Sequence, residues 1–365
     1  MKTYVYKLYR SKKNKELHKK IDIAGIIYNH CIALHKRYYR LFGKSLNLYR
    51  LQKHITKLKK MVRYTFWKEV GSQAIQDITE RIDKAYKLFY SNLKRKVRTA
   101  PPKFKKVAKY HSFSLKQAGY KYVGNNVITI QGRQYKFSKS RELDGRIKRI
   151  TVKRDSLGDI YVCFICEVEE NEVLARTGKS VGFDFGFKKF LTSSDGNDVV
   201  SPLFFKRNIN ALKRANRNLS RKVKGSNNFK RAKLALVRLH KKVHNQRSDF
   251  HWQLANKLCG EYAVICLEDL NLKGMQRLYG RKIGDLGFAE FVDILEYKAC
   301  RAGTRLVKVD RYFASSQTCS ECGHKNHELK DLRIRSWQCK KCGAMHDRDR
   351  NAAINILNEG MKMVA

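Results

Sequence analysis

The sequence predicts a multidomain α+β protein, and three observations support this prediction. Apolar residues recur at three- and four-residue steps between about residues 15 and 98, which is typical of amphipathic helices. Strand-like segments follow, up to about residue 169. From Ser180 onward, strands alternate with helices around a cysteine-rich insert, which indicates a mixed α/β sheet. A chain of 365 residues, 42% of them hydrophobic, can bury more than one core.

The first part of the chain combines one isolated strand with a helical bundle. Residues Met1 to Arg10 alternate like a strand, and the apolar stripes after them predict about four helices. Lys and Arg occupy the outer faces of these helices. Pro101 and Pro102 end the bundle, because proline disfavours helix in the residue before it and cannot continue one.

The next part, from about Lys105 to Glu169, has the alternation and turn signals of antiparallel strands. Two turns are expected, at Gly132-Arg133 and from Ser156 to Asp159. These strands predict a small basic β-barrel, which could also include the first strand of the chain. The acidic, polar stretch from Glu169 to Lys179 is expected to be a linker.

The last part begins with two strands that Asp195-Gly196 is expected to join as a hairpin. The segment from Asn208 to about Leu258 should be long, helical and very basic. The segment "YAVICLEDL" is a continuous apolar run, which predicts a central strand covered on both faces. A helix from Leu286 to Ala302, the strand "RLVKVDRYF" and the closing helix "RNAAINILNEG" complete this region.

The charge of the chain predicts a polyanionic partner. Lys and Arg number 79 against 32 Asp and Glu, a formal net charge of +47. A membrane surface is the weaker candidate, since no apolar run is long enough to span a bilayer. The N-terminus has no apolar segment of the kind that signal peptides contain. We therefore expect a cytoplasmic protein whose ten cysteines are thiols or metal ligands.

The cysteine-rich insert predicts a structural zinc ribbon. Two C-x2-C pairs, each followed by glycine, are separated by sixteen residues, and four thiolates close the coordination of a tetrahedral ion. Three nearby histidines, His324, His327 and His346, then have no vacant position on the metal. The expected zinc ligands are Cys319, Cys322, Cys339 and Cys342.

Asp184 is a lone carboxylate in the phenylalanine-rich run "SVGFDFGFKKF". Read with period two, Val181 and the phenylalanines face one side, whereas Asp184 shares the other side with Gly182 and Gly186. Burying a charge costs several kcal/mol unless it is paired or bound to a cation. We expect the two glycines to leave room for a metal ion and a phosphate beside Asp184.

Two further acids lie at apolar edges of the same region. Glu268 ends the predicted central strand, where α/β proteins build ligand sites, and Asp269 points to the opposite face. In "HDRDRNAAINIL", Asp349 shares a core-facing stripe with two alanines and an isoleucine, so it is expected to be buried. Asp347 is better explained as an N-cap or a solvated charge.

Each acid alone also has a structural explanation. Asp184 could mark a β-bulge, Glu268 a surface ion pair, and Asp349 a charge favoured by the helix dipole. Together they are three carboxylates from separate elements of one α/β region in a chain that must bind a polyanion. Oxygen ligands suit Mg²⁺, and two such ions can stabilise the attacking and leaving oxygens of a phosphodiester. The residues thus predict a Mg²⁺-dependent nuclease of RNase H-like fold.

Four segments resemble the three RuvC motifs and the zinc ribbon of the TnpB (OrfB) proteins of insertion sequences. They are "VGFDFGFKKFLTSSDG", "ICLEDLNLKGM", "SSQTCSECG" and "CGAMHDRDRNAAINIL". The segment "GFAEFVDILEYKACRAG" is also similar to that family. The likeness spans nearly the whole chain and is most specific after Ser180. Two departures, "RSKKNKE" after the first strand and Ala314 where the family commonly has proline, touch neither the acids nor the cysteines.

The resemblance implies an RNA-guided DNA endonuclease related to type V CRISPR effectors. Asp184, Glu268 and Asp349 match the family's catalytic acids, which hold Mg²⁺. The protein would bind a transposon-derived guide RNA as a monomer and cleave double-stranded DNA beside a short adjacent motif after one strand is displaced. The implied boundaries are the first strand of a wedge β-barrel at 1–12, a helical recognition domain at 13–103, the rest of the wedge β-barrel at 104–172, a RuvC-like nuclease domain at 173–315, the zinc ribbon at 316–345 and the last nuclease helix at 346–365.

Three alternatives remain open at this point. A miniature type V CRISPR effector would use the same chemistry, and a repeat array beside the gene would identify it. A non-catalytic RNA-guided DNA-binding regulator would bind without cleaving, although all three acids are present here. A DDE-type transposase shares the fold superfamily, but the ribbon between the last strand and the last helix favours the TnpB-like interpretation.

Overall fold

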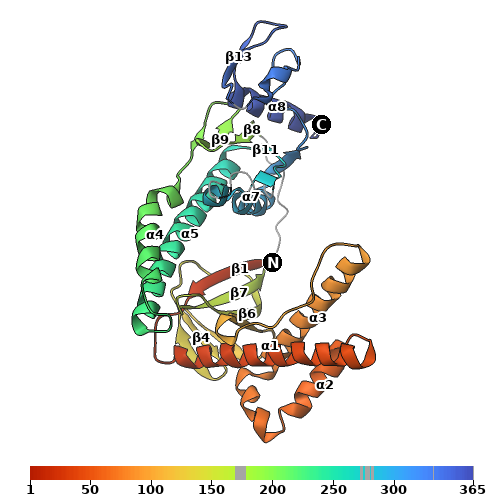
Figure 1. The fold of residues 1–365 in the computed structure, drawn as a ribbon, viewed down its shortest axis with the longest axis vertical. Helices are drawn as coiled ribbons and strands as arrows, with labels where there is room; N and C mark the ends of the chain where they lie inside the picture. The colour runs from red at the N-terminus through yellow and green to blue at the C-terminus, as the bar shows by residue number, and fades with distance from the viewer. Residues whose placement is uncertain (169–177, 272–273, 276–279, 281–282, 332, 365) are drawn as a thin grey trace. The chain divides into compact units, whose positions relative to one another are not determined.

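The computed structural model describes residues 1–168, 178–271, 274–275, 280, 283–331 and 333–364 (Figure 1). The chain forms two compact units, Met1–Glu169 and Glu170–Ala365. The expected linker, Glu169 to Lys179, lies mostly outside the described residues. No helix in the described part of the chain has the length and apolar character needed to cross a membrane.

The first unit contains the expected helical bundle. Its helices are α1 (Asn14–Phe42), α2 (Leu48–Leu58), η1 (Val62–Val70), α3 (Ser72–Lys94) and the short η2 (Val107–Lys109), of which η1 and η2 are 3₁₀ helices. Helix α1 ends at Gly43, whose φ of 62° suits glycine, and its N–H bonds to the Tyr39 carbonyl. The apolar stripes of α1, α2 and α3 are buried around Trp67, as their spacing predicts.

The first unit also contains two antiparallel sheets. The larger has the order β1-β7-β6-β2, with β1 (Lys2–Lys7), β7 (Ile160–Glu167), β6 (Arg146–Arg154) and β2 (Ser112–Leu115). The smaller has the order β3-β4-β5, with β3 (Tyr120–Gly124), β4 (Val127–Ile130) and β5 (Arg133–Lys136). A bridge between Leu8 and Phe137 links the two sheets. The first strand thus joins the later strands, as expected, whereas closure into a barrel stays a prediction.

The second unit is built on one mixed sheet. Its order is β10-β9-β8-β11-β12, with β8 (Ser180–Phe185), β9 (Lys189–Ser193), β10 (Val199–Val200), β11 (Val264–Glu268) and β12 (Arg305–Val309). Strand β11 is parallel to both of its neighbours, β8 and β12. This confirms "YAVICLEDL" as a central strand.

One local expectation in this unit was wrong. The phenylalanine run is not one strand, because the chain turns after Phe185 and β9 pairs antiparallel with β8. The Asp195-Gly196 turn does join two antiparallel strands, as expected, but these are β9 and the short β10. The basic segment is helical, as expected, and consists of α4 (Phe204–Ser220) and α5 (Asn227–Glu261), which are separated by a turn in which Gly225 has a φ of 89°. Ser226 then caps α5 by accepting a hydrogen bond from the Phe229 N–H.

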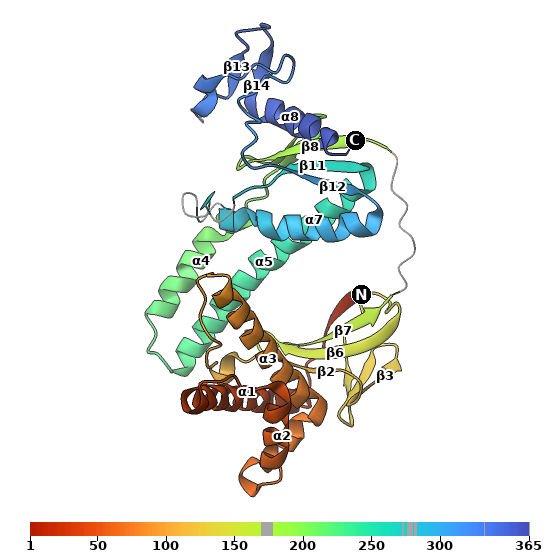
Figure 2. The ribbon, with the colours of Figure 1, turned by 90° about the vertical axis from the view of Figure 1, so that its right-hand side faces the viewer.

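Helices cover both faces of the mixed sheet (Figure 2). Helices α5 and α7 (Phe288–Ala302) bury one face in a core that contains Phe183 and Leu267. Helix α8 (Arg348–Lys362) covers the other face, where Ile356 packs with Cys266 and Val307. Between β12 and α8 the chain forms a small cysteine-rich module with η3 (His327–Lys330), β13 (Ser336–Gln338) and β14 (Met345–Asp347).

Candidate active site and metal centre

Asp184 and Glu268 lie on adjacent parallel strands and face the same way. The register pairs Phe183 of β8 with Leu267 of β11, so the two acids follow at equivalent positions. Phe183 and Leu267 are buried against α5 and α7. Because side chains alternate along a strand, Asp184 and Glu268 point to the other face, which α8 covers. Both acids are therefore at the carboxyl edge of the parallel strands, on the α8 side.

Close backbone packing brings the start of α8 to the same place. A Cβ on Gly182 would lie 2.2 Å from the Ala353 carbonyl oxygen, and one on Gly360 would lie 2.3 Å from the Cys266 Sγ. The glycine at 182 is thus required by the approach of α8, which corrects the expectation that it leaves room for a metal ion. Asp349 lies one turn before Ala353, in the first turn of the helix.

The three acids form one electrostatic cluster. Burial raises the pKa of Asp184 to about 8, and the negative charges of Glu268 and Asp349 add to the effect, while Arg348 opposes it. Burial also raises the pKa of Glu268, with a smaller contribution from the charge of Asp269. The charges of Glu268 and Asp349 thus both act on Asp184, whereas among the described residues only the four cysteines form a group whose ligand atoms all lie within 4.8 Å of one another.

Asp349 is more exposed than its stripe of apolar neighbours predicts. Its side chain keeps 38% of its accessible surface, because Arg335 draws it toward the cysteine-rich module. The Arg335 Nη1 lies 3.0 Å and 3.3 Å from the two carboxylate oxygens. Asp347 is the N-cap of α8, as expected, and its Oδ1 accepts a hydrogen bond from the Arg350 N–H at 2.9 Å. Asp269 pairs with Arg311.

Sequence reasoning missed three buried polar residues of α8. Asn351 accepts a hydrogen bond from the Ser320 N–H at 2.9 Å and donates one to the Thr318 carbonyl at 2.7 Å. Asn355 donates to the same Thr318 carbonyl at 2.6 Å. The Arg348 guanidinium donates to the Asp331 carbonyl, 2.7 Å away. The i, i+4 spacing of the two asparagines inside an apolar helix was the available signal. These bonds fasten the cysteine-rich module to α8.

The four predicted cysteines come together in one group, which we call the cysteine cluster. All four Sγ atoms lie within 4.8 Å of one another. Cys319 and Cys342 have their Sγ atoms 3.7 Å apart, and those of Cys322 and Cys339 are 3.6 Å apart. A tetrahedron with Zn–S distances of about 2.3 Å has S–S edges of about 3.8 Å. The cluster fits a structural zinc ion.

Two family profiles match parts of the chain. Residues 163–278 match the OrfB_IS605 family, described as "Probable transposase", and residues 288–356 match the Cas12f1-like TNB domain. A "Putative RNA-guided DNA endonuclease" of Streptomyces pristinaespiralis is 31% identical over 361 residues, which cover 95% of this chain and 86% of that protein. The chain belongs to the TnpB (OrfB) family.

Other members and a solved structure agree with this assignment. The "Putative RNA-guided DNA endonuclease InsQ" of Escherichia coli K12 is 27% identical over 368 residues, covering 96% of this chain and 90% of InsQ. The cryo-EM structure of a Cas12f1–sgRNA–target DNA complex matches 95% of this chain and 83% of its own, with a TM-score of 0.61 and 16% identity. The structural match shows the shared fold.

Proposed function

We propose that this TnpB-family protein is an RNA-guided DNA endonuclease of an insertion sequence, with Asp184, Glu268 and Asp349 as its catalytic acids. The raised pKa of Asp184, caused by burial and by two neighbouring carboxylates, is the observation that supports this assignment most directly. The strand order, with three parallel strands next to an antiparallel pair, supports an RNase H-like (RuvC) fold for this unit.

The acid cluster fits divalent cations of the Mg²⁺ type. Its donors are carboxylate oxygens, which such ions prefer. When bound, these ions would activate water and stabilise the charge that develops on a cleaved phosphodiester. The protein's own contribution is positional: β8 and β11 fix two acids side by side, and α8 supplies the third. Arg335 holds the Asp349 carboxylate toward the cysteine-rich module.

The helical hairpin of α4 and α5 supports a nucleic-acid partner. The sequence contains no Asp or Glu from residue 199 to 248, whereas Lys and Arg recur along the whole segment. Such a surface binds a phosphate backbone without regard to sequence. In this class of enzyme, base pairing between guide RNA and target DNA supplies the sequence specificity. We therefore assign guide RNA and target DNA as partners, with zinc in the cysteine cluster as a structural ion.

The test compares two acids at the start of α8. Asp349→Asn should abolish Mg²⁺-dependent cleavage of target DNA but preserve RNA-dependent DNA binding. Asp347→Asn is the matched control and should cleave normally, because asparagine is an equally good N-cap. Equal cleavage by the two variants would remove Asp349 from the catalytic set.

The guide-RNA part of the proposal needs its own measurement. RNA that copurifies with the protein should be sequenced, and we expect one discrete species rather than a mixture of cellular RNA. If it maps beside a CRISPR array instead of a transposon end, the miniature CRISPR effector becomes the better assignment. If no discrete species is found, the RNA-guided function is wrong.

A further inference from the structure

The cysteine-rich module contains one buried histidine, His346, directly beside the cysteine cluster. Its Nε2 lies 3.1 Å from the Cys319 Sγ. The residue keeps only 9% of its accessible surface. Four cysteines complete a tetrahedral site, so the sequence leaves this histidine no position on the metal. The geometry agrees that it is not a ligand, because among the described residues only the four cysteine Sγ atoms form a group that all lie within 4.8 Å of one another.

Strand pairing and ring packing fix the imidazole in place. His346 pairs with Trp337 across β13 and β14, and their ring centroids are 4.7 Å apart. Trp337 is itself buried and lies two residues before Cys339. The ring therefore cannot turn away from Cys319 without disturbing the strand that leads into the second knuckle.

The two C-x2-C knuckles otherwise have the same hydrogen bonds. The Cys319 N–H bonds to the His324 carbonyl and the Gly323 N–H returns to the Cys319 carbonyl, each at 2.9 Å. Cys339 makes the equivalent bonds with Ala344 and Gly343, again at 2.9 Å. In each knuckle, the first cysteine's Sγ also accepts backbone N–H groups. Among the bonds described for these Sγ atoms, only Cys319 has a contact with a side chain outside the cysteine cluster, and that side chain is His346.

We propose that His346 is a positioning residue of the metal centre, whose Nε2–H donates a hydrogen bond to the Cys319 thiolate and slows the loss of the ion. This inference rests on the proposal that the cysteine cluster holds zinc. Four thiolates around one Zn²⁺ leave a net charge of −2, so a donor aimed at one sulfur stabilises the loaded site. Partners of this kind orient the ligands and commonly change metal affinity about 10- to 100-fold.

His346 also begins the segment that leads to the candidate active site. Strand β14 ends at Asp347, and α8 starts at Arg348, followed by Asp349. A zinc ion bound by Cys319, whose Sγ His346 contacts, would thus stabilise the end of β14 immediately before the third acid. Loss of zinc should loosen this segment in addition to the knuckles themselves.

The experiment measures the rate at which the full-length protein releases zinc to a chromogenic chelator. His346→Phe keeps an aromatic ring against Trp337 but removes the donor, and we expect release to be about tenfold faster. His346→Leu removes the donor without the larger ring. His346→Gln keeps an N–H donor and should release zinc at nearly the wild-type rate. His327→Phe changes an exposed histidine of the same module and is the matched control.

Four outcomes decide the proposal. The proposal is supported if His346→Phe and His346→Leu release zinc faster than the wild type, while His346→Gln and His327→Phe release it at nearly the wild-type rate. Wild-type rates in His346→Phe and His346→Leu would overturn it, as would a Co²⁺-substituted His346→Leu protein that has lost its four-thiolate charge-transfer spectrum, because His346 would then be a ligand. Purified wild-type protein without zinc would instead overturn the zinc assignment itself.

Discussion

Asp159 in the first unit and Asp184 in the second both lie at strand ends, yet their pKa values move in opposite directions. Burial acts to raise both. Hydrogen bonds from Lys7 and Arg10 reverse that effect at Asp159 and bring its pKa to about 2. At Asp184 the neighbours are mainly other carboxylates, and the pKa rises to about 8. One acid has its cations supplied by the fold, whereas the other is suited to a cation from solution.

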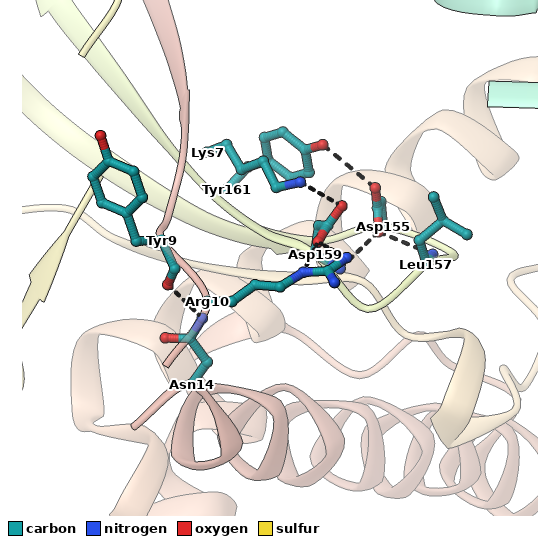
Figure 3. Close-up of polar contacts among 8 residues, drawn as sticks. All are labelled: Lys7, Tyr9, Arg10, Asn14, Asp155, Leu157, Asp159 and Tyr161. Carbon is teal, nitrogen blue, oxygen red and sulfur yellow. Dashed lines mark hydrogen bonds and ion pairs between the residues drawn. The ribbon is translucent and has the colours of Figure 1, made fainter. Parts of the chain in front are cut away.

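The surroundings of Asp159 explain why it is a structural residue (Figure 3). Its side chain is 4% exposed, and its oxygens lie 2.7 Å from the Lys7 Nζ and 2.9 Å from the Arg10 Nη2. Asp155 shapes the turn before β7 by accepting hydrogen bonds from the Leu157 and Asp159 N–H groups, both at 2.9 Å. These contacts fasten the end of β1 to the β6–β7 turn. The comparison teaches that a buried acid becomes a functional candidate when the fold leaves its charge largely uncompensated.

The largest expected effect is on cleavage by an Asp184 variant. Asp184→Asn keeps the size of the side chain but removes the charge that holds a divalent cation. Since metal ions contribute several kcal/mol of transition-state stabilisation, we expect cleavage of target DNA to fall at least about 1,000-fold. Single-turnover cleavage assays with saturating protein and guide RNA measure this. Asp159→Asn, compared at a temperature where both variants are folded, should retain cleavage; equal losses would break the distinction between the two acids.

A smaller effect is expected on stability when Asp159 is neutralised. Asp159→Asn weakens three charge-assisted hydrogen bonds, one from Lys7 and two from Arg10. We expect the free energy of unfolding to fall by about 1–2 kcal/mol, because Lys7 and Arg10 can regain water. Hydrogen exchange of the amides that pair β1 with β7 reports this locally. The control is Asp144→Asn, since Asp144 is exposed and lies 3.8 Å from Lys2 on the same sheet. Exchange rates in Asp159→Asn no faster than in this control would contradict the structural role.

The sequence predicts this contrast only in part. Period-two alternation identified Asp184 as an acid on the face opposite the phenylalanines, and the end of the apolar run identified Glu268. The helical stripe placed Asp349 too deeply, because the periodicity of α8 contains no information about Arg335 in another element. Gly182 was assigned to the metal for the same reason, as only the packed structure shows Ala353 against it. Local sequence patterns contain no information about contacts between elements that are far apart in the sequence.

The cysteine cluster was easier to predict than the acid cluster, for a physical reason. Each C-x2-C pair is local, so its spacing alone fixes two ligands in one knuckle. The acids come from three elements, and only the parallel pairing of β8 with β11 and the close approach of α8 unite them. Asn351 and Asn355 were missed because polar residues inside an apolar stripe have no local explanation until their partners in the module are known.

The last prediction concerns the pH dependence of stability without added divalent cations. Because the folded pKa of Asp184 is about 8 and its ordinary value is 3.8, the folded state keeps a proton that the unfolded state has lost between these values. The contribution of Asp184 to the free energy of unfolding therefore falls as the pH rises from about 5 to about 8, by at most about 1.4 kcal/mol per pH unit. The contribution of Asp159 to the free energy of unfolding is constant between about pH 5 and about pH 8. Because its pKa is lowered from 3.8 to about 2, this contribution is lost only when the pH falls from 3.8 toward 2.

Melting temperatures of wild type and Asp184→Asn, measured from about pH 5 to about pH 8, isolate this contribution. The melting temperature of the variant should rise relative to that of the wild type as the pH rises. Histidines and other titrating groups are common to both proteins, so their effect cancels in this difference. Chelators are omitted so that the cysteine cluster keeps its metal. Saturating Mg²⁺ should shrink the difference, because the cation replaces the proton as the partner of Asp184. A difference that is independent of both pH and Mg²⁺ would show that the Asp184 charge is compensated within the fold, as that of Asp159 is.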